Sequence, residues 1–223
     1  MKTAKAMRAA FTANWLLAGR LPGPRRASWD PASAGAPQFV TAVVRLPPQL
    51  AGDLADAASR LPDARSRHYL YPPSSIHLTV LGLGGRAGLD EVIGATARRH
   101  SPFAVEVRGL NVSRETVFAE LYPEGSGLRE LREALRRVES REHGWASRWL
   151  RRRFAHANLL RFAAPVDRSL LAGVRAMRGR RFGRFEVAEI ELVRTDKVLS
   201  APGTRTLGRF GLGAFAQGPR QPG

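Results

Sequence analysis

Two stretches of the chain decide the fold: residues 75–81, which read SIHLTVL, and residues 154–160, which read FAHANLL. Both stretches alternate between two kinds of side chain, and this period of two predicts β-strands. Because successive side chains of a strand point to opposite faces, each strand is expected to turn an apolar face toward a core. The other face then carries a histidine and, two residues later, a hydrogen-bonding side chain.

These polar faces carry the candidate chemistry. His77 and Thr79 share the first face, and His156 and Asn158 share the second. Transfer at phosphorus needs one group that takes a proton from the attacking water and another that protonates the departing oxygen, and histidine suits both tasks. The Thr79 hydroxyl and the Asn158 amide can donate to the non-bridging oxygens. One such dyad has little specificity, so the hypothesis depends on finding two at corresponding places.

The remaining periodicity predicts an α+β protein with the element order β-α-β-α-β-β-α-β-α-β-β. Some strands are joined by links too short for a crossover, so those pairs are expected to be antiparallel. We therefore expect a mixed or antiparallel sheet with helices outside. The order divides into two similar halves, near residues 39–110 and 116–195. Strands are expected at 39–46, 75–83, 103–110, 116–121, 154–163, 185–193 and 204–212, and helices around 50–61, 89–97, 128–138 and 170–177.

Composition narrows the function classes. The 223 residues contain 36 Lys and Arg against 19 Asp and Glu, a net charge of +17. A positive field of this size favours partners that carry phosphate, although a bias toward arginine on a solvated surface would give the same number. The absence of cysteine excludes disulfides, thiolate metal ligands and cysteine nucleophiles. It also gives no reason to place the protein outside the reducing cytosol, so we expect a cytoplasmic protein. No run of 18 apolar residues occurs, so we expect no transmembrane helix and no membrane partner.

The ends of the chain differ in character from the middle. Residues 1–19 loosely resemble a signal peptide, but the apolar run is short and no clean cleavage site follows. Residues 21–38 are rich in Pro, Ala, Gly and Ser, which is typical of a flexible segment. We therefore expect a flexible or extra segment over 1–38, one domain over 39–213 and a disordered tail over 214–223.

The two dyads resemble the signature of the 2H phosphoesterases, a superfamily that includes 2'-5' RNA ligase-like proteins and cyclic phosphodiesterases. That signature is a pair of His-x-Thr or His-x-Ser motifs, each on a strand flanked by apolar residues. The likeness extends to the proline-containing loop before the first motif, in residues 71–84, and to a closing hairpin within residues 185–212. It covers the chain from about Phe39 to Leu212.

The resemblance implies a bilobal, pseudo-two-fold fold with sheets lining a central groove and helices outside. It implies hydrolysis of 2',3'-cyclic phosphates or 2'-5' phosphodiesters of RNA or nucleotides, without metal or other cofactor, by a protein expected to be a monomer. His77 and His156 match the catalytic positions, and Thr79 matches a phosphate-binding position. Asn158 departs from the pattern, because the family has Thr or Ser there, and this leaves the rate and the substrate open.

Four further residues are candidate substrate contacts. Tyr71 precedes the first motif and can stack on a base, or simply pack within its loop. Arg153 ends an arginine-rich run before the second motif, which suits a basic rim for phosphates or a solvated loop. Lys197 and Arg205 flank a turn near the expected end of the groove. No group of histidines and carboxylates has the spacing of metal ligands.

Two other functions remain open. The groove can retain affinity for RNA ends or nucleotides but turn over poorly because of Asn158. Alternatively, the protein acts on a small cyclic phosphate outside RNA. Turnover and binding assays on cyclic nucleotides and RNA separate these possibilities.

Overall fold

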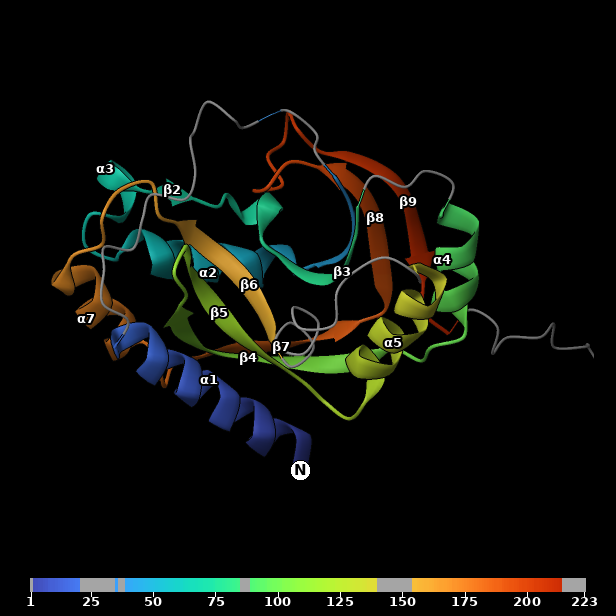
Figure 1. Ribbon diagram of the computed structural model, residues 1–223, viewed down its shortest axis with the longest axis horizontal. Helices are drawn as coiled ribbons and strands as arrows, with labels where there is room; N and C mark the ends of the chain where they lie inside the picture. The colour runs from blue at the N-terminus through green and yellow to red at the C-terminus, as the bar shows by residue number, and fades with distance from the viewer. Residues whose placement is uncertain (1, 21–34, 36–38, 85–88, 140–153, 214–223) are drawn as a thin grey trace, which may run out of the picture.

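The computed structural model describes residues 2–20, 35, 39–84, 89–139 and 154–213, which form two curved antiparallel sheets with helices packed around them (Figure 1). No helix within these residues is long and apolar enough to cross a membrane. The strands are β1 (Phe39–Arg45), β2 (Tyr69–Leu70), β3 (His77–Gly84), β4 (Phe103–Val112), β5 (Thr116–Pro123), β6 (Ala155–Arg161), β7 (Arg181–Val187), β8 (Glu189–Thr195) and β9 (Arg205–Gly211). The helices are α1 (Lys2–Arg20), α2 (Pro48–Ser59), α3 (Ala64–Arg67), the 3-10 turn η2 (Pro73–Ser75), α4 (Asp90–Arg98), α5 (Gly127–Glu139) and α7 (Arg168–Ala176).

Each sheet takes strands from both halves of the chain. One sheet has the order β3-β1-β8-β9 and the other has the order β2-β6-β5-β4-β7. All strand pairs in them are antiparallel. The expected α+β class is therefore confirmed, and of the two expected kinds of sheet, mixed or antiparallel, the described strands form the antiparallel kind. The two histidine-bearing strands, β3 and β6, contact each other across the sheets and lie near the middle of the molecule (Figure 1).

Helices cover the apolar faces of the sheets as their patterns predict. α2 begins with Pro48 in its first turn, where a missing N–H costs nothing, and it buries the expected stripe of Leu50, Leu54 and Ala58. α7 is capped by Asp167, whose side chain accepts a hydrogen bond from the Leu170 N–H. α2 and α7 contact the sheet that contains β6, whereas α4 and α5 contact the sheet that contains β3.

The single strand expected at residues 185–193 is wrong. The segment forms two strands, β7 and β8, which belong to different sheets. Phe185 and Val187 face the core from β7, and Ile190 and Leu192 face it from β8. The buried positions thus change from odd to even numbers between the two strands, and this change of phase marks where the chain leaves one sheet for the other.

The N-terminal segment contains a helix that the sequence analysis did not predict. α1 spans 19 residues and contacts β4 and β5. The expected flexible lead-in at 21–34 and 36–38 and the expected tail at 214–223 lie outside the described residues, so they stay predictions.

A substitution at Gly109 tests the assignment of a β-bulge in β4. The pairing of β4 with β5 shifts between Val107 and Leu110, and Gly109 has a φ of 78°. A Cβ at this position would lie 2.5 Å from the Arg178 carbonyl oxygen. We expect Gly109→Ala to lower the free energy of unfolding by about 1–3 kcal/mol or more, because it combines a left-handed backbone with a clash.

Gly52 in α2 supplies the matched control, because a Cβ there meets nothing within 4 Å. Gly52→Ala is expected to stabilise by about 0.5–1 kcal/mol through higher helix propensity. Urea unfolding of both variants measures the difference, and equal stabilities would contradict the assignment of the bulge.

Candidate active site

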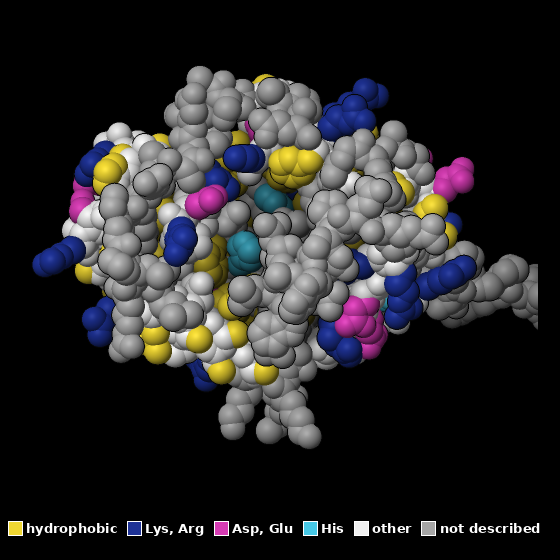
Figure 2. Space-filling model, in the orientation of Figure 1, with side chains coloured by type: hydrophobic (Ala, Val, Ile, Leu, Met, Phe, Trp, Pro, Cys, Tyr) yellow, Lys and Arg dark blue, Asp and Glu magenta, His cyan; other side chains and the backbone are white. Residues whose placement is uncertain are grey.

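The structure places the two predicted dyads on facing strands. His77 and Thr79 project from the polar face of β3, and His156 and Asn158 project from the polar face of β6. His77 is 6% exposed, His156 and Asn158 are partly exposed and Thr79 is exposed. Histidine side chains (cyan) are visible in a hollow near the centre of the face shown in Figure 2. The charge of His77 lowers the pKa of His156, so the two imidazoles lie within electrostatic reach of each other.

A main-chain carbonyl fixes the tautomer of His77. The Nδ1 atom of His77 lies 2.7 Å from the carbonyl oxygen of Ser75. A carbonyl only accepts, so Nδ1 carries the hydrogen and the neutral ring has its lone pair on Nε2. Nε2 is therefore the atom through which His77 exchanges a proton with a ligand.

Ser75 is itself held by a distant loop. Its hydroxyl donates to the carbonyl oxygen of Leu199 at 2.7 Å. Leu199 has a φ of 50°, and its loop is stabilised by the buried carboxylate of Asp196. One oxygen of Asp196 accepts from the N–H groups of Val198 and Ser200, and the other accepts from the Ser200 hydroxyl. This chain of contacts anchors the residue that orients His77.

An ion pair between Arg45 of β1 and Glu191 of β8 lies beside His77. Arg45 is the cross-strand partner of His77, so their side chains lie on the same face. The Nε atom of Arg45 lies 3.0 Å from a carboxylate oxygen of Glu191, and the other Glu191 oxygen lies 3.0 Å from Arg209. Arg45 also donates to the Ser74 carbonyl oxygen at 2.7 Å. This places a fixed positive charge beside the first histidine.

A bulge in β6 adds a third polar side chain to the second dyad. Phe118 pairs with Asn158, but the next residue of β5, Val117, pairs with Leu160. The extra residue in β6 reverses the alternation, so Arg161 lies on the same face as His156 and Asn158. Its guanidinium is 2.9 Å from a carboxylate oxygen of Glu115 and 3.4 Å from the Tyr71 hydroxyl.

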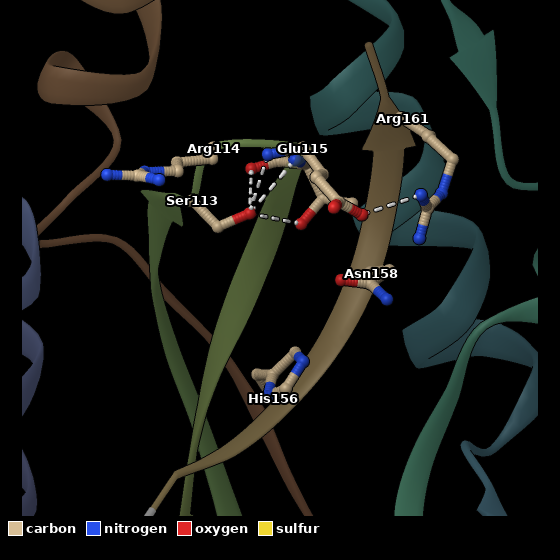
Figure 3. A pocket seen from close by; sticks show the side chains of 7 residues that line it. Ser113, Arg114, Glu115, His156, Asn158 and Arg161 are labelled. Atoms are coloured by element: carbon tan, nitrogen blue, oxygen red, sulfur yellow. Dashed lines mark hydrogen bonds and ion pairs between the residues drawn. The ribbon is translucent and has the colours of Figure 1, made fainter. Parts of the chain in front are cut away.

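These side chains line a cavity of about 320 Å³ between β6 and the β4–β5 turn (Figure 3). His156, Asn158 and Arg161 follow one another along β6, and Arg114 extends away from them. The cavity is lined by Ser113, Arg114, Glu115, Thr116, His156, Asn158 and Arg161. Its lining is mostly polar and includes two arginines, which suits a small anionic ligand.

Arg132 of α5 joins the two histidine strands. Its guanidinium donates to the carbonyl oxygens of Thr79 and Val80 on β3, at 2.7 and 3.0 Å, and to that of Phe154, just before β6, at 3.1 Å. The side chain is buried, and burial lowers its pKa to about 10. It thus fixes the separation of the dyads through the main chain.

Burial keeps both histidines neutral at ordinary pH. Desolvation lowers the pKa of His77 from 6.5 to about 4; Arg45 adds to this, and the hydrogen bond to Ser75 opposes it. Desolvation also lowers the pKa of His156 to about 4, and the charges of Arg132 and His77 add to it. Each ring can therefore accept a proton, and an anionic ligand would favour its protonated form.

The other candidate contacts are placed less favourably. Tyr71 is 1% exposed and packs edge-on against Tyr69, so its ring has no open face for a base. Lys197 and Arg205 are both exposed, Lys197 in the loop that holds Ser75 and Arg205 at the start of the edge strand β9. Arg153 lies outside the described residues. Contacts of Lys197, Arg205 and Arg153 with substrate stay predictions.

Three arginines of the site were missed by the sequence analysis. Arg45 and Arg132 come from segments with no motif of their own. Arg161 lies an odd number of residues beyond His156, and simple alternation would place it on the core face. The one available signal in the sequence was the pair of consecutive apolar residues Leu159 and Leu160, which breaks the alternation. The structure buries both.

Within the described residues, no group of three or more His, Cys, Asp or Glu side chains could hold a metal ion. No protein-family model and no curated protein matches the sequence. Solved structures do match the fold. TT0787 of Thermus thermophilus is 26% identical, covers 78% of this chain and 98% of its own, and gives a TM-score of 0.57.

Two further structures are similar. E. coli LigT complexed with 3'-AMP is 20% identical, with a TM-score of 0.56, and a protein described as a phosphoesterase is 19% identical, also with a TM-score of 0.56. In each case the match covers 79% of this chain and 98% of the other. These structures share the fold of this chain, and about a fifth of this chain lies outside the match.

The two depressed pKa values predict how stability depends on pH. Between pH 6.5 and about 4 the unfolded chain binds protons at His77 and His156 and the folded protein does not, so stability falls as the pH falls. Each histidine contributes at most about 1.4 kcal/mol per pH unit. Urea unfolding at pH 7, 6 and 5 should show a shallower decline for the double variant His77→Gln and His156→Gln than for the wild type. Parallel declines would contradict this prediction.

Proposed function

We propose, on the premise that this chain has the 2H phosphoesterase fold, that it hydrolyses 2',3'-cyclic phosphates or 2'-5' phosphodiesters of RNA or nucleotides without a metal ion. The single observation that carries the proposal is the pairing of His77 with Thr79 and of His156 with Asn158 on two strands that contact each other. Such a site needs no resident cofactor, because histidines move the protons and neutral donors hold the phosphate.

The reaction uses the imidazoles in opposite protonation states. One neutral histidine takes a proton from water as the water oxygen attacks phosphorus. The other histidine, protonated when the anion binds, gives its proton to the 2' or 3' oxygen as the P–O bond breaks. The Thr79 hydroxyl and the Asn158 amide donate to the non-bridging oxygens, where negative charge grows in the transition state.

Several features of the site support this reaction. His77 is buried and His156 is partly buried, and this removal from bulk water strengthens the hydrogen bonds to a bound phosphate. His77 has Nε2 free of the Ser75 contact, and Arg132 holds β3 and β6 together at the level of the dyads. LigT, which has this fold, has been crystallised with phosphate and with 3'-AMP. The positive net charge of +17 favours the approach of an anion.

Asn158 favours a second candidate function. In this alternative the protein is a module that binds RNA ends or nucleotides and turns them over slowly. An amide donates to phosphate as a hydroxyl does, but it is larger and places its donor farther from the main chain. Tight binding of 3'-AMP or RNA by a wild-type protein that shows no turnover would support this alternative.

Alanine substitution tests the catalytic assignment. We expect His77→Ala and His156→Ala each to lower kcat on a 2',3'-cyclic nucleotide by about 100-fold to 10,000-fold, because each removes a general acid or base. Wild-type activity should be unchanged by EDTA. His100→Ala is the control, since His100 bonds the Thr96 carbonyl at the end of α4, outside the groove. Activity that survives either groove substitution, or that is lost in EDTA, would contradict the mechanism.

Asn158 is tested by two replacements. We expect Asn158→Ala to lower kcat by about 100-fold, because one donor to the developing charge is removed. Asn158→Thr should keep at least the wild-type rate, since it restores the donor typical of this fold. Steady-state kinetics on the same substrate measures both, and an alanine variant as active as the wild type would remove Asn158 from the site.

A further inference from the structure

The polar face of the β6 sheet extends well beyond the second dyad. Glu120 of β5 is the cross-strand partner of His156, and Phe118 is that of Asn158. Asn111 of β4 is in turn the partner of Phe118. Cross-strand partners point to the same side of a sheet. His156 and Asn158 therefore share one continuous surface with side chains of β4 and β5.

α1 lies on this surface. The ring of Phe11, which is 1% exposed, has its centroid 5.4 Å from that of Tyr122 and 5.2 Å from that of Phe154. Phe118 lies 6.1 Å from Phe11 on one side and 5.2 Å from the His156 ring on the other. The covered area thus ends one aromatic ring away from the second histidine.

Polar side chains beneath α1 bind to the helix. The amide of Asn111 donates to the Phe11 carbonyl oxygen at 3.0 Å and to Glu120 at 2.7 Å. Asn14 donates to the Asn111 side chain and to the Val112 carbonyl oxygen. Asn111 is completely buried, and Glu120 is 4% exposed, with a pKa raised by that burial. Polar side chains such as these are typical of a surface that is open to solvent, but here α1 covers them.

The open part of the same surface lies on the other side of His156. The cavity is lined by β6 side chains from His156 to Arg161 and, opposite them, by the β4–β5 turn (Figure 3). In Figure 1, α1 runs along the lower left of the molecule, next to β4 and β5, and it contacts both strands. The surface around the second histidine therefore has one closed side and one open side.

We infer that α1 is a specificity element: it closes the β4–β5 side of the groove, so that the site accepts a terminal or mononucleotide 2',3'-cyclic phosphate and excludes an internal 2'-5' linkage. An internal phosphodiester carries nucleotides on both sides of the phosphorus and needs space on both sides of the dyads. A cyclic phosphate carries its nucleoside on one side only and fits the open part from Asn158 to Arg161. This inference rests on the proposed function and selects between its two substrate classes.

About a fifth of this chain is extra to the shared fold. The similar structures match over 98% of their own length but only 78–79% of this chain. The resemblance in sequence begins at Phe39, which leaves out the segment that contains α1. A helix that precedes the part bearing the resemblance can alter the groove without altering the dyads.

Three substrates test the inference. The first is adenosine 2',3'-cyclic phosphate, and the second is an RNA decamer ending in a 2',3'-cyclic phosphate. The third is a decamer of the same sequence that has one central 2'-5' linkage and no cyclic phosphate. For the wild type we expect kcat/KM on the two cyclic phosphates to exceed that on the internal linkage by at least 100-fold. The double variant Phe11→Ala and Asn14→Ala loosens α1, and we expect it to narrow this ratio by at least 10-fold. A loss of kcat that is common to all three substrates leaves this ratio of kcat/KM values unchanged.

The control is Leu16→Ala, since Leu16 is 53% exposed on α1 and should leave the ratio unchanged. Hydrogen exchange of residues 2–20 verifies that the double variant loosens the helix. A wild type that cleaves the internal linkage as well as the cyclic ends overturns the inference, as does an unchanged ratio with a loosened helix.

Failure of the proposed function gives a different result, namely no turnover of any substrate. The closure is then measured by fluorescence anisotropy with a labelled DNA decamer that has no terminal phosphate. Tighter binding by the loosened variant than by the wild type would support a groove closed by α1, and equal affinities would overturn it.

Discussion

The geometry of the site depends on the hydrogen bonds that the buried guanidinium of Arg132 donates to the main chain. The guanidinium bonds main-chain carbonyl oxygens of β3 and of the residue before β6, and these belong to different sheets. Its acceptors are fixed in position because they belong to the backbone, whereas flexible carboxylates could follow it. A cation that is removed from water must keep such partners, since unpaired burial is costly. The distance between the two dyads is therefore set by a side chain that does not itself belong to either of them.

Electrostatics and burial act on the two histidines in the same direction. Desolvation is the largest cause of the low pKa of each ring, and a nearby arginine adds to it: Arg45 for His77 and Arg132 for His156. Both rings are thus kept uncharged until an anion enters. A phosphate supplies the negative charge that lets one ring hold a proton. In the proposed reaction, binding of the phosphate and protonation of the acid are therefore coupled.

The two sides of the groove are supported differently. On the β3 side, the loop around Asp196 and Leu199 holds Ser75, and Ser75 orients His77. On the β6 side, α1 packs Phe11 against Phe118, and Phe118 contacts His156. The first support lies within the part of the chain whose sequence resembles the 2H phosphoesterases, and the second comes from a helix that precedes this part. A difference in substrate preference from other proteins of this fold would therefore arise most simply on the β6 side.

The sequence by itself determined the α+β class, the helix stripes and the face on which each dyad residue lies, because strand and helix periodicity act within a few residues. The likeness to the 2H phosphoesterases, read from the same two motifs, is confirmed at the level of the fold. Only the tertiary structure decided that residues 181–195 divide between two sheets, that a bulge turns Arg161 toward Asn158, and that α1 covers part of the groove face. The physical reason is that these two kinds of information act over different distances along the chain. Alternation fixes the direction of a side chain relative to its own strand. Packing between distant segments decides which of them meet, and here it brings Arg132 to β3 and Phe11 to Phe118.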